Sequence, residues 1–150
     1  MLFRSFYEKA YKLREKLSSE YYFDMPMYKN QIGTAYEGLG DYEKAKNCYR
    51  EALSLLEELE LAGNLDEAIF QRNLANALMF QRKFEDAIEP SERAYYIRMK
   101  LLENHPQTVC SIFRQGVLQA NLGHLNKVLQ LFLDGLGMEE TLSVGNHGEV

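Results

Sequence analysis

Apolar residues recur along the chain with the spacing of amphipathic helices. In one segment they stand three or four residues apart, at Tyr28, Ile32, Ala35, Tyr36 and Leu39. The next segment repeats the pattern at Tyr42, Ala45, Tyr49, Ala52, Leu53 and Leu56. Such spacing gathers the apolar side chains on one face of a helix. Because Gly40-Asp41 separates the two segments and glycine accepts the backbone conformation that ends a helix, the pattern predicts two helices joined by a tight turn.

This helical hairpin is repeated along the sequence. Residues 30–36 align with 72–78, and residues 41–45 align with 83–87, both at a spacing of 42. A small residue recurs in four copies at steps of 42, 42 and 41 residues, as Ala10, Ala52, Ala94 and Gly135. Side chains larger than alanine would separate helices that cross closely, so we expect the small residues at helix contacts. The large residues of the register are expected in the core: Tyr36, Tyr42, Tyr49, Leu74, Leu78 and Phe84.

The register predicts an all-α solenoid in a single domain, residues 1–140. A leading helix is expected over 3–20. The hairpins are expected over 25–61, 65–102 and 107–140, with helices at 25–39 and 42–61, 65–81 and 84–102, and 107–122 and 125–140. Residues 141–150 are interpreted as a tail or as the start of a truncated further repeat.

Several of these residues form a motif that resembles the tetratricopeptide repeat (TPR), whose unit is two antiparallel helices in roughly 34 residues. The motif is Ile32-Gly33-x-x-Tyr36, Gly40-x-Tyr42, Ala45, Tyr49 and Ala52. The period of about 42, the tract 85–94 and the linker 101–109 resemble the longer-period subtype of kinesin light chains and nephrocystin-3. The resemblance implies a right-handed superhelical solenoid in which the first helix of each hairpin lines a concave groove. It also implies that the groove binds an extended segment of another protein.

Charge and hydropathy exclude several other functions. The chain has 17 Lys and Arg against 22 Asp and Glu, a formal net charge of −5, so no bulk positive field would attract nucleic acid. No apolar run approaches the roughly 18 residues that span a bilayer, so we expect no membrane insertion. Cys48 and Cys110 stand far apart, outside any CxxC pair, which fits a reducing, cytoplasmic location.

We find no motif for a catalyst or a cofactor. The histidines His105, His124 and His147 lie at predicted turns or linkers and lack the i, i+4 partners of a helical metal site. No GxGxxG, GxxxxGK or GxSxG motif occurs. The chain is therefore predicted to be neither an enzyme nor a binder of metal or cofactor.

Polar residues on the first helices of the hairpins are the candidate contacts for a bound peptide. Arg72 and Asn76 are i, i+4 neighbours and share one helix face. The full set is Asn30, Thr34, Arg72, Asn73, Asn76 and Arg114. Asn can pair with backbone amides, and Arg can bind a carboxylate through two hydrogen bonds, so the set predicts a short, extended, partly acidic peptide. The alternative is that these residues only keep the helices solvated.

Two functions remain after these exclusions. The first is a peptide-binding adaptor or scaffold that acts through its groove. The second is a structural or self-association segment of a larger multi-repeat signalling or transport protein. It is suggested by Leu2, Phe3, Phe6 and Tyr7, which lack a covering helix in the predicted arrangement. It is also suggested by residues 145–150, which resemble residues 104–109 at the start of another unit.

Overall fold

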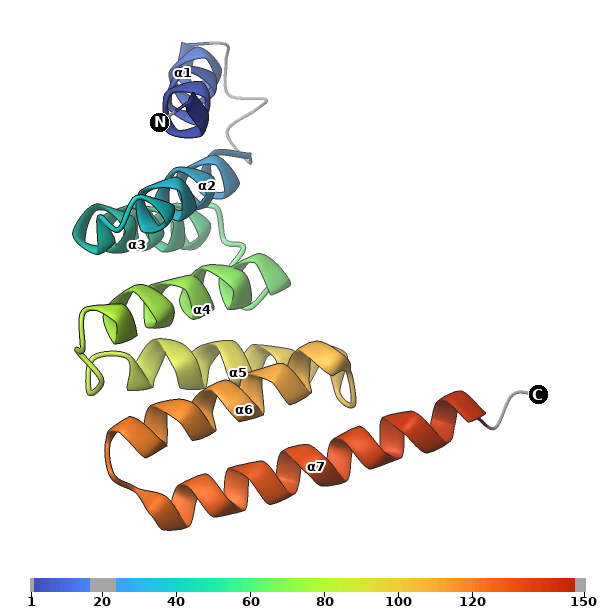
Figure 1. The fold of residues 1–150 in the computed structure, drawn as a ribbon. Coiled ribbons are helices and arrows are strands. Elements are labelled where there is room, and N and C mark those ends of the chain that lie inside the picture. Colours follow the sequence, from blue (N-terminus) through green and yellow to red (C-terminus); the bar gives the residue numbers. More distant parts are fainter. Residues whose placement is uncertain (1, 17–23, 148–150) are drawn as a thin grey trace.

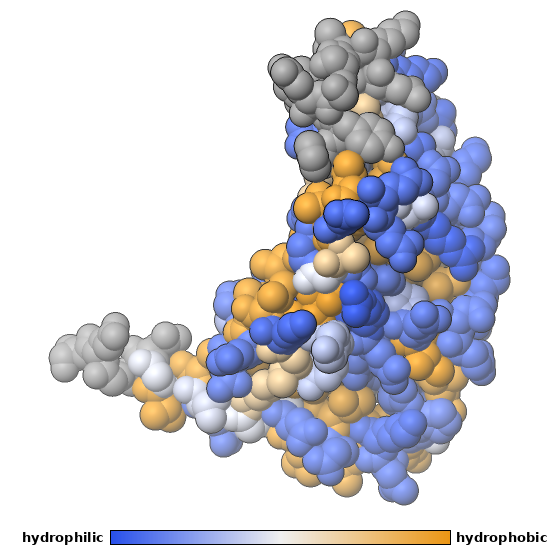
Figure 2. Space-filling view, turned by 180° about the vertical axis from the view of Figure 1, so that it is seen from behind, coloured by the Kyte–Doolittle hydropathy of each residue, from blue (hydrophilic) through white to orange (hydrophobic). Residues whose placement is uncertain are grey.

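A computed structural model describes residues 2–16 and 24–147. These residues form seven helices and no strand: α1 (Leu2–Lys16), α2 (Met25–Gly38), α3 (Tyr42–Glu58), α4 (Leu65–Phe80), α5 (Ile88–Leu102), α6 (Pro106–Asn121) and α7 (Leu125–His147). The helices stack in chain order into an elongated solenoid, and the far end of α7 projects from it (Figure 1). The space-filling view from behind shows the curved outline of the stack (Figure 2). The predicted all-α class is confirmed.

Three helix ends differ from the sequence prediction by three or more residues, and the first is that of α3, which ends at Glu58 and not at residue 61. Helix α5 begins at Ile88 and not at residue 84, because Pro90 has no N–H to donate to the carbonyl of Asp86. One i to i−4 bond precedes the helix, from the Ala87 amide to the Lys83 carbonyl at 3.2 Å, and after Pro90 such bonding resumes with the Ser91 amide, which donates to the Ala87 carbonyl at 3.1 Å. Helix α7 continues past residue 140 to His147, since no proline interrupts the segment that was interpreted as a tail. Residues 17–20, included in the expected leading helix, lie outside the described residues.

The core lies between consecutive hairpins. Tyr49, Leu74 and Leu78 are buried there together with small residues of the repeat register: Ala45, Ala75 and Ala87. Tyr36 and Phe84 are partly buried against this cluster. Tyr42 is half-buried, and its ring stacks on Phe80 with the centroids 5.0 Å apart. The residues expected in the core therefore do pack, and the aromatic ones among them lie mostly at its edge.

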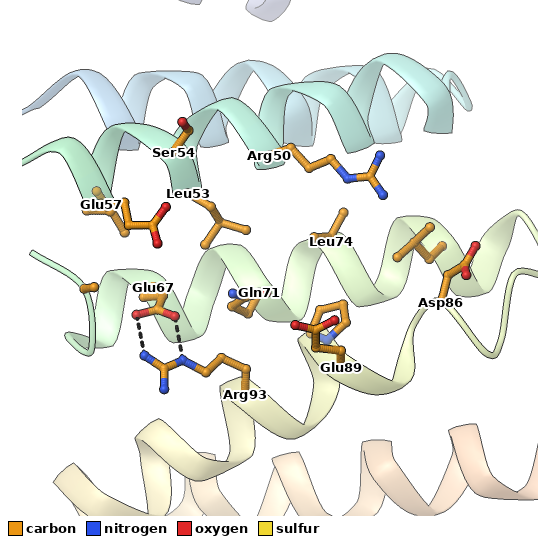
Figure 3. Close-up of a pocket in the computed structure, with 14 residues that line it drawn as sticks. Arg50, Leu53, Ser54, Glu57, Glu67, Gln71, Leu74, Asp86, Glu89 and Arg93 are labelled. Atoms are coloured by element: carbon orange, nitrogen blue, oxygen red, sulfur yellow. Dashed lines mark hydrogen bonds and ion pairs between the residues drawn. The ribbon is translucent and has the colours of Figure 1, made fainter.

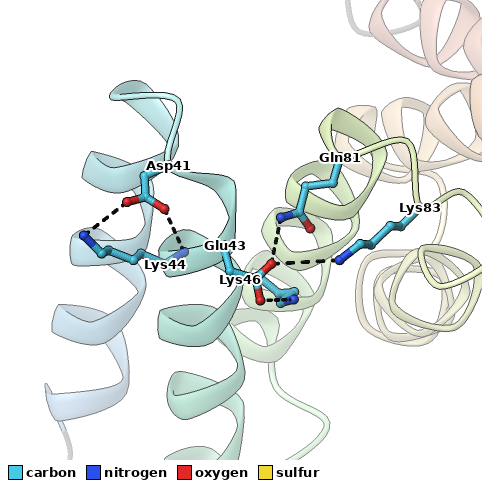
Figure 4. A network of polar contacts seen from close by, with 6 residues as sticks. All are labelled: Asp41, Glu43, Lys44, Lys46, Gln81 and Lys83. Carbon is cyan, nitrogen blue, oxygen red and sulfur yellow. Dashed lines mark hydrogen bonds and ion pairs between the residues drawn. The ribbon is translucent and has the colours of Figure 1, made fainter.

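Polar contacts at one end of α3 connect the first two hairpins (Figure 4). Glu43 pairs with Lys46 at 2.5 Å, accepts a hydrogen bond from Gln81 at 2.9 Å and lies 3.9 Å from Lys83. The bonds from Lys46 and Gln81 lower the pKa of Glu43 to about 2. On this exposed side of the molecule, lysine charges lie next to carboxylates.

Replacing Gly33 with alanine is expected to destabilise the chain by about 1–3 kcal/mol, although alanine is the better helix former. An added Cβ would lie 2.6 Å from Cε1 of the Tyr49 ring. That ring is fully buried, and its hydroxyl donates to Glu37 at 2.8 Å, so it cannot easily move away. The measurement is urea unfolding followed by circular dichroism.

Gly38→Ala is the matched control in the same helix. A Cβ at Gly38 meets nothing within 4 Å, so the control should leave stability unchanged or raise it by up to about 1 kcal/mol. Equal stability of the two variants would contradict the close packing of α2 on α3.

Candidate functional site

Side chains of the first helices meet across the hairpins. Asn73 on α4 donates through Nδ2 to Oδ1 of Asn30 on α2 at 2.9 Å. Arg72 donates through Nε and Nη2 to Oδ1 of Asn73 at 3.3 and 3.2 Å. Asn30 is buried and Asn73 is half-buried. These two amides therefore position Arg72, and Asn30 offers little surface to a ligand.

The other three predicted residues lie on the same helices. Arg114 on α6 donates through Nη1 to Oδ1 of Asn76 on α4 at 3.0 Å. Thr34 is exposed on α2 and donates to the Asn30 carbonyl at 3.1 Å. Bonds from α2 to α4 and from α4 to α6 thus connect the three helices that carry the six predicted residues, and we call the side on which these residues lie the α2–α4–α6 face.

Sequence reasoning missed two residues behind this face, Arg98 on α5 and Ser111 on α6. Arg98 is 3% exposed, and its Nη1 donates to Oγ of Ser111 at 2.5 Å. The sequence did contain a signal for Arg98. One period of 42 earlier stands Leu56, which is 3% exposed in the core, so an arginine occupies a position that is apolar in the preceding repeat.

Three arginines line one small pocket of about 20 Å³ between α4, α5 and α6. We call it the Arg72–Arg98–Arg114 pocket; its other lining residues are Ala75, Asn76, Met79, Ser91, Ala94 and Ser111. Its lining includes no carboxylate. Glu37, whose charge raises the pKa of Arg72, is itself bonded to Tyr49.

The positive charges in this pocket act on one another. Burial lowers the pKa of Arg98, and the charges of Arg72 and Arg114 lower it further. Burial also lowers the pKa of Arg72, again with a contribution from Arg114. The pocket is therefore a concentrated positive site within an acidic chain.

A groove of about 600 Å³, larger than the Arg72–Arg98–Arg114 pocket, lies between α3, α4 and α5 (Figure 3). Glu67 and Arg93 pair across it through two hydrogen bonds of 2.7 and 3.2 Å. Glu57, Asp86 and Glu89 add further carboxylates to its walls, and leucines form part of its lining. None of the six predicted residues lines this groove, and its charge is opposite to that of the Arg72–Arg98–Arg114 pocket.

Within the described residues, no helix has both the length and the apolar character needed to cross a membrane. Within the same ranges, 2–16 and 24–147, no three His, Cys, Asp or Glu side chains gather as a metal site would require.

Comparison with known proteins gives consistent matches. The tetratricopeptide-repeat family matches residues 28–59 and again residues 71–107. The FK506-binding protein-like protein of Homo sapiens is 32% identical over 95 residues, which are 63% of this chain and 25% of that protein. The chain thus spans a quarter of the length of this curated relative.

Solved structures share the fold at lower sequence identity. The crystal structure of BtubC (BKLC) from P. vanneervenii superposes with a TM-score of 0.86 at 20% identity, covering 91% of this chain and 54% of that one. A putative kinesin light chain with nearly identical TPR-like repeats, from Podosopora anserina, gives a TM-score of 0.81 at 15% identity over 92% and 66% of the two chains. At these identities the likeness concerns the fold alone.

Proposed function

Because the chain is a tetratricopeptide-repeat protein whose fold resembles that of kinesin light chain repeats, we propose that it binds an extended, partly acidic peptide of a protein partner in its groove. Such repeats form protein–protein interaction modules, and their fold is typically a non-catalytic scaffold. The proposed role is that of a cytoplasmic adaptor without enzymatic activity. Its binding site is the α2–α4–α6 face.

One observation carries this proposal: among the described residues, no carboxylate forms an ion pair with Arg72 or Arg114 on the α2–α4–α6 face. Each donates to a neutral asparagine oxygen. Ion pairs elsewhere in the described residues join Lys44 to Asp41 and Arg93 to Glu67. A guanidinium held by a neutral group keeps donors free for a carboxylate of a bound peptide, which it can contact through two parallel hydrogen bonds.

A peptide-display screen on the purified chain tests the proposal. We expect enrichment of acidic peptides on the wild-type chain. The enrichment should be lost in the double variant Arg72→Glu, Asn76→Ala. The first change repels an acidic ligand, and the second removes the amide oxygen that holds the Arg114 side chain in position. Circular dichroism should show both chains equally helical. Enrichment that is identical in both chains would place the binding site elsewhere.

The first and last helices, α1 and α7, favour a second candidate function, a structural or self-association segment of a larger protein. Helix α7 exposes a row of leucines, and α1 exposes several apolar side chains: Leu125, Leu129, Leu133 and Leu136, and Leu2, Phe3, Phe6 and Leu13. Apolar faces of this kind are typical of surfaces that pack on further helices. Light scattering over a concentration series distinguishes the two candidates, since a monomer at all concentrations would contradict self-association.

A further inference from the structure

Arg98 is a buried cation that forms no ion pair with any acidic side chain among the described residues. Its side chain is nearly inaccessible, and its hydrogen bond goes to the hydroxyl of Ser111, which donates in turn to the Gln107 carbonyl at 3.0 Å. Both partners are neutral. Arginine is seldom fully buried unless it is paired with an acid, because removing an unpaired charge from water is costly.

Two further guanidinium groups add to this charge. Arg72 and Arg114 line the same pocket as Arg98, which gives the pocket a formal charge of +3 with no carboxylate in its lining. The described ion pairs of the chain involve none of these three arginines; Arg93, in contrast, is paired with Glu67. Three like charges gathered in one pocket favour the binding of an anion.

The dimensions of the pocket restrict that anion. A volume of about 20 Å³ holds about one water-sized group, so the pocket admits one terminal oxygen of an anion, and the rest of the anionic group would lie at the mouth beside Arg114. Arg114 forms the exposed wall and is held there by one hydrogen bond to Asn76. A rotation of this side chain would widen the mouth, whereas Arg98 stays fixed behind it.

We propose that the Arg72–Arg98–Arg114 pocket binds the phosphate group of a phosphoserine or phosphothreonine in the bound peptide. A carboxylate would offset one of the three positive charges. A phosphate monoester carries about −1.5 to −2 at pH 7 and has three terminal oxygens, which matches several guanidinium donors at once. This inference rests on the proposed function, because the phosphorylated residue belongs to the peptide in the groove.

The first experiment measures thermal unfolding in sodium phosphate and in sodium chloride of equal ionic strength. We expect phosphate to raise the melting temperature of the wild-type chain by about 2–4 °C, since a ligand of the folded state stabilises it. Arg98→Met keeps the side-chain length and removes the buried charge, so this variant should melt at or above the wild-type temperature in chloride and gain clearly less from phosphate than the wild type, retaining only the general stabilisation by an excluded salt. Arg50→Met, at an exposed arginine of α3, is the control and should respond as the wild type does.

The second experiment separates a phosphopeptide from free phosphate. Three degenerate heptapeptide libraries with a central phosphoserine, glutamate or serine are compared by fluorescence anisotropy. We expect the phosphoserine library to bind the wild-type chain at least about tenfold more tightly than the glutamate library. Arg98→Met should lose this preference, and Arg50→Met should keep it. If Arg98→Met does not fold, Arg114→Gln, at an exposed position, should reduce the preference instead.

The outcomes also separate this inference from the proposed function. Equal binding of the phosphoserine and glutamate libraries would overturn the phosphate site. It would leave the proposed binding of acidic peptides on the α2–α4–α6 face unaffected. A preference that survives in Arg98→Met, or stabilisation by inorganic phosphate without a preference for the phosphoserine library, would also overturn it. If no library binds the folded chain, the proposed function fails as well.

Discussion

Phe70→Ala is expected to lower the free energy of unfolding by about 3–5 kcal/mol. Phe70 is fully buried on α4, where it packs with Ala52 and Leu56 of α3. Met27 of α2 packs against the same cluster. Truncation would leave a cavity at the contact between the first two hairpins, and in a solenoid such contacts between neighbours supply much of the stability. Urea unfolding monitored by circular dichroism measures the loss.

Phe3→Ala is the matched control, because it removes the same atoms from a side chain that is 74% exposed on α1. A surface substitution of this kind should change stability by less than about 0.5 kcal/mol. Similar losses in both variants would mean that Phe70 does not lie in the core.

Arg72→Glu is expected to weaken binding of a display-selected acidic peptide by at least about 30-fold, equivalent to about 2 kcal/mol. The change removes a donor from the α2–α4–α6 face. It also introduces a carboxylate beside Arg98 and Arg114, which can satisfy both guanidinium groups within the protein and so displace an acidic ligand. Calorimetric titration of the peptide into each variant measures the effect, and the variant should remain folded.

Arg50→Glu makes the same charge reversal in the groove between α3, α4 and α5, which Arg50 lines together with Glu57 and Glu89. Its net effect on the charge of the protein equals that of Arg72→Glu, so it controls for long-range electrostatics. The affinity of the selected peptide should change by less than about threefold. A comparable loss in both variants would show that overall charge, and not the α2–α4–α6 face, determines binding.

The repeat period made most of the fold predictable. The small residues that recur at steps of 42 or 41 residues lie at helix contacts, as Ala52, Ala94 and Gly135 do, because close helix crossings tolerate no larger side chain. The end of α7 was harder to predict, since residues 141–147 have weak apolar periodicity but contain no proline. The start of α5 could be predicted only from a local effect, because Pro90 has no N–H to donate to the carbonyl of Asp86.

The candidate site was predictable only in part. Periodicity placed Arg72, Asn76 and Arg114 on one surface, because it fixes which way a helical side chain points. It could not indicate that Asn30 and Asn73 bond to each other, since that depends on the separation of α2 and α4. Arg98 was missed because candidate contacts were sought only on the first helix of each hairpin, whereas this side chain reaches the pocket from α5, a second helix.

The central claim is that the α2–α4–α6 face binds an extended acidic peptide, and nuclear magnetic resonance titration of the labelled chain tests it most directly. With a display-selected peptide, the largest amide and side-chain shifts should fall on Thr34, Arg72, Asn76 and Arg114. Shifts confined to the groove between α3, α4 and α5, around Glu57 and Glu89, would contradict the account.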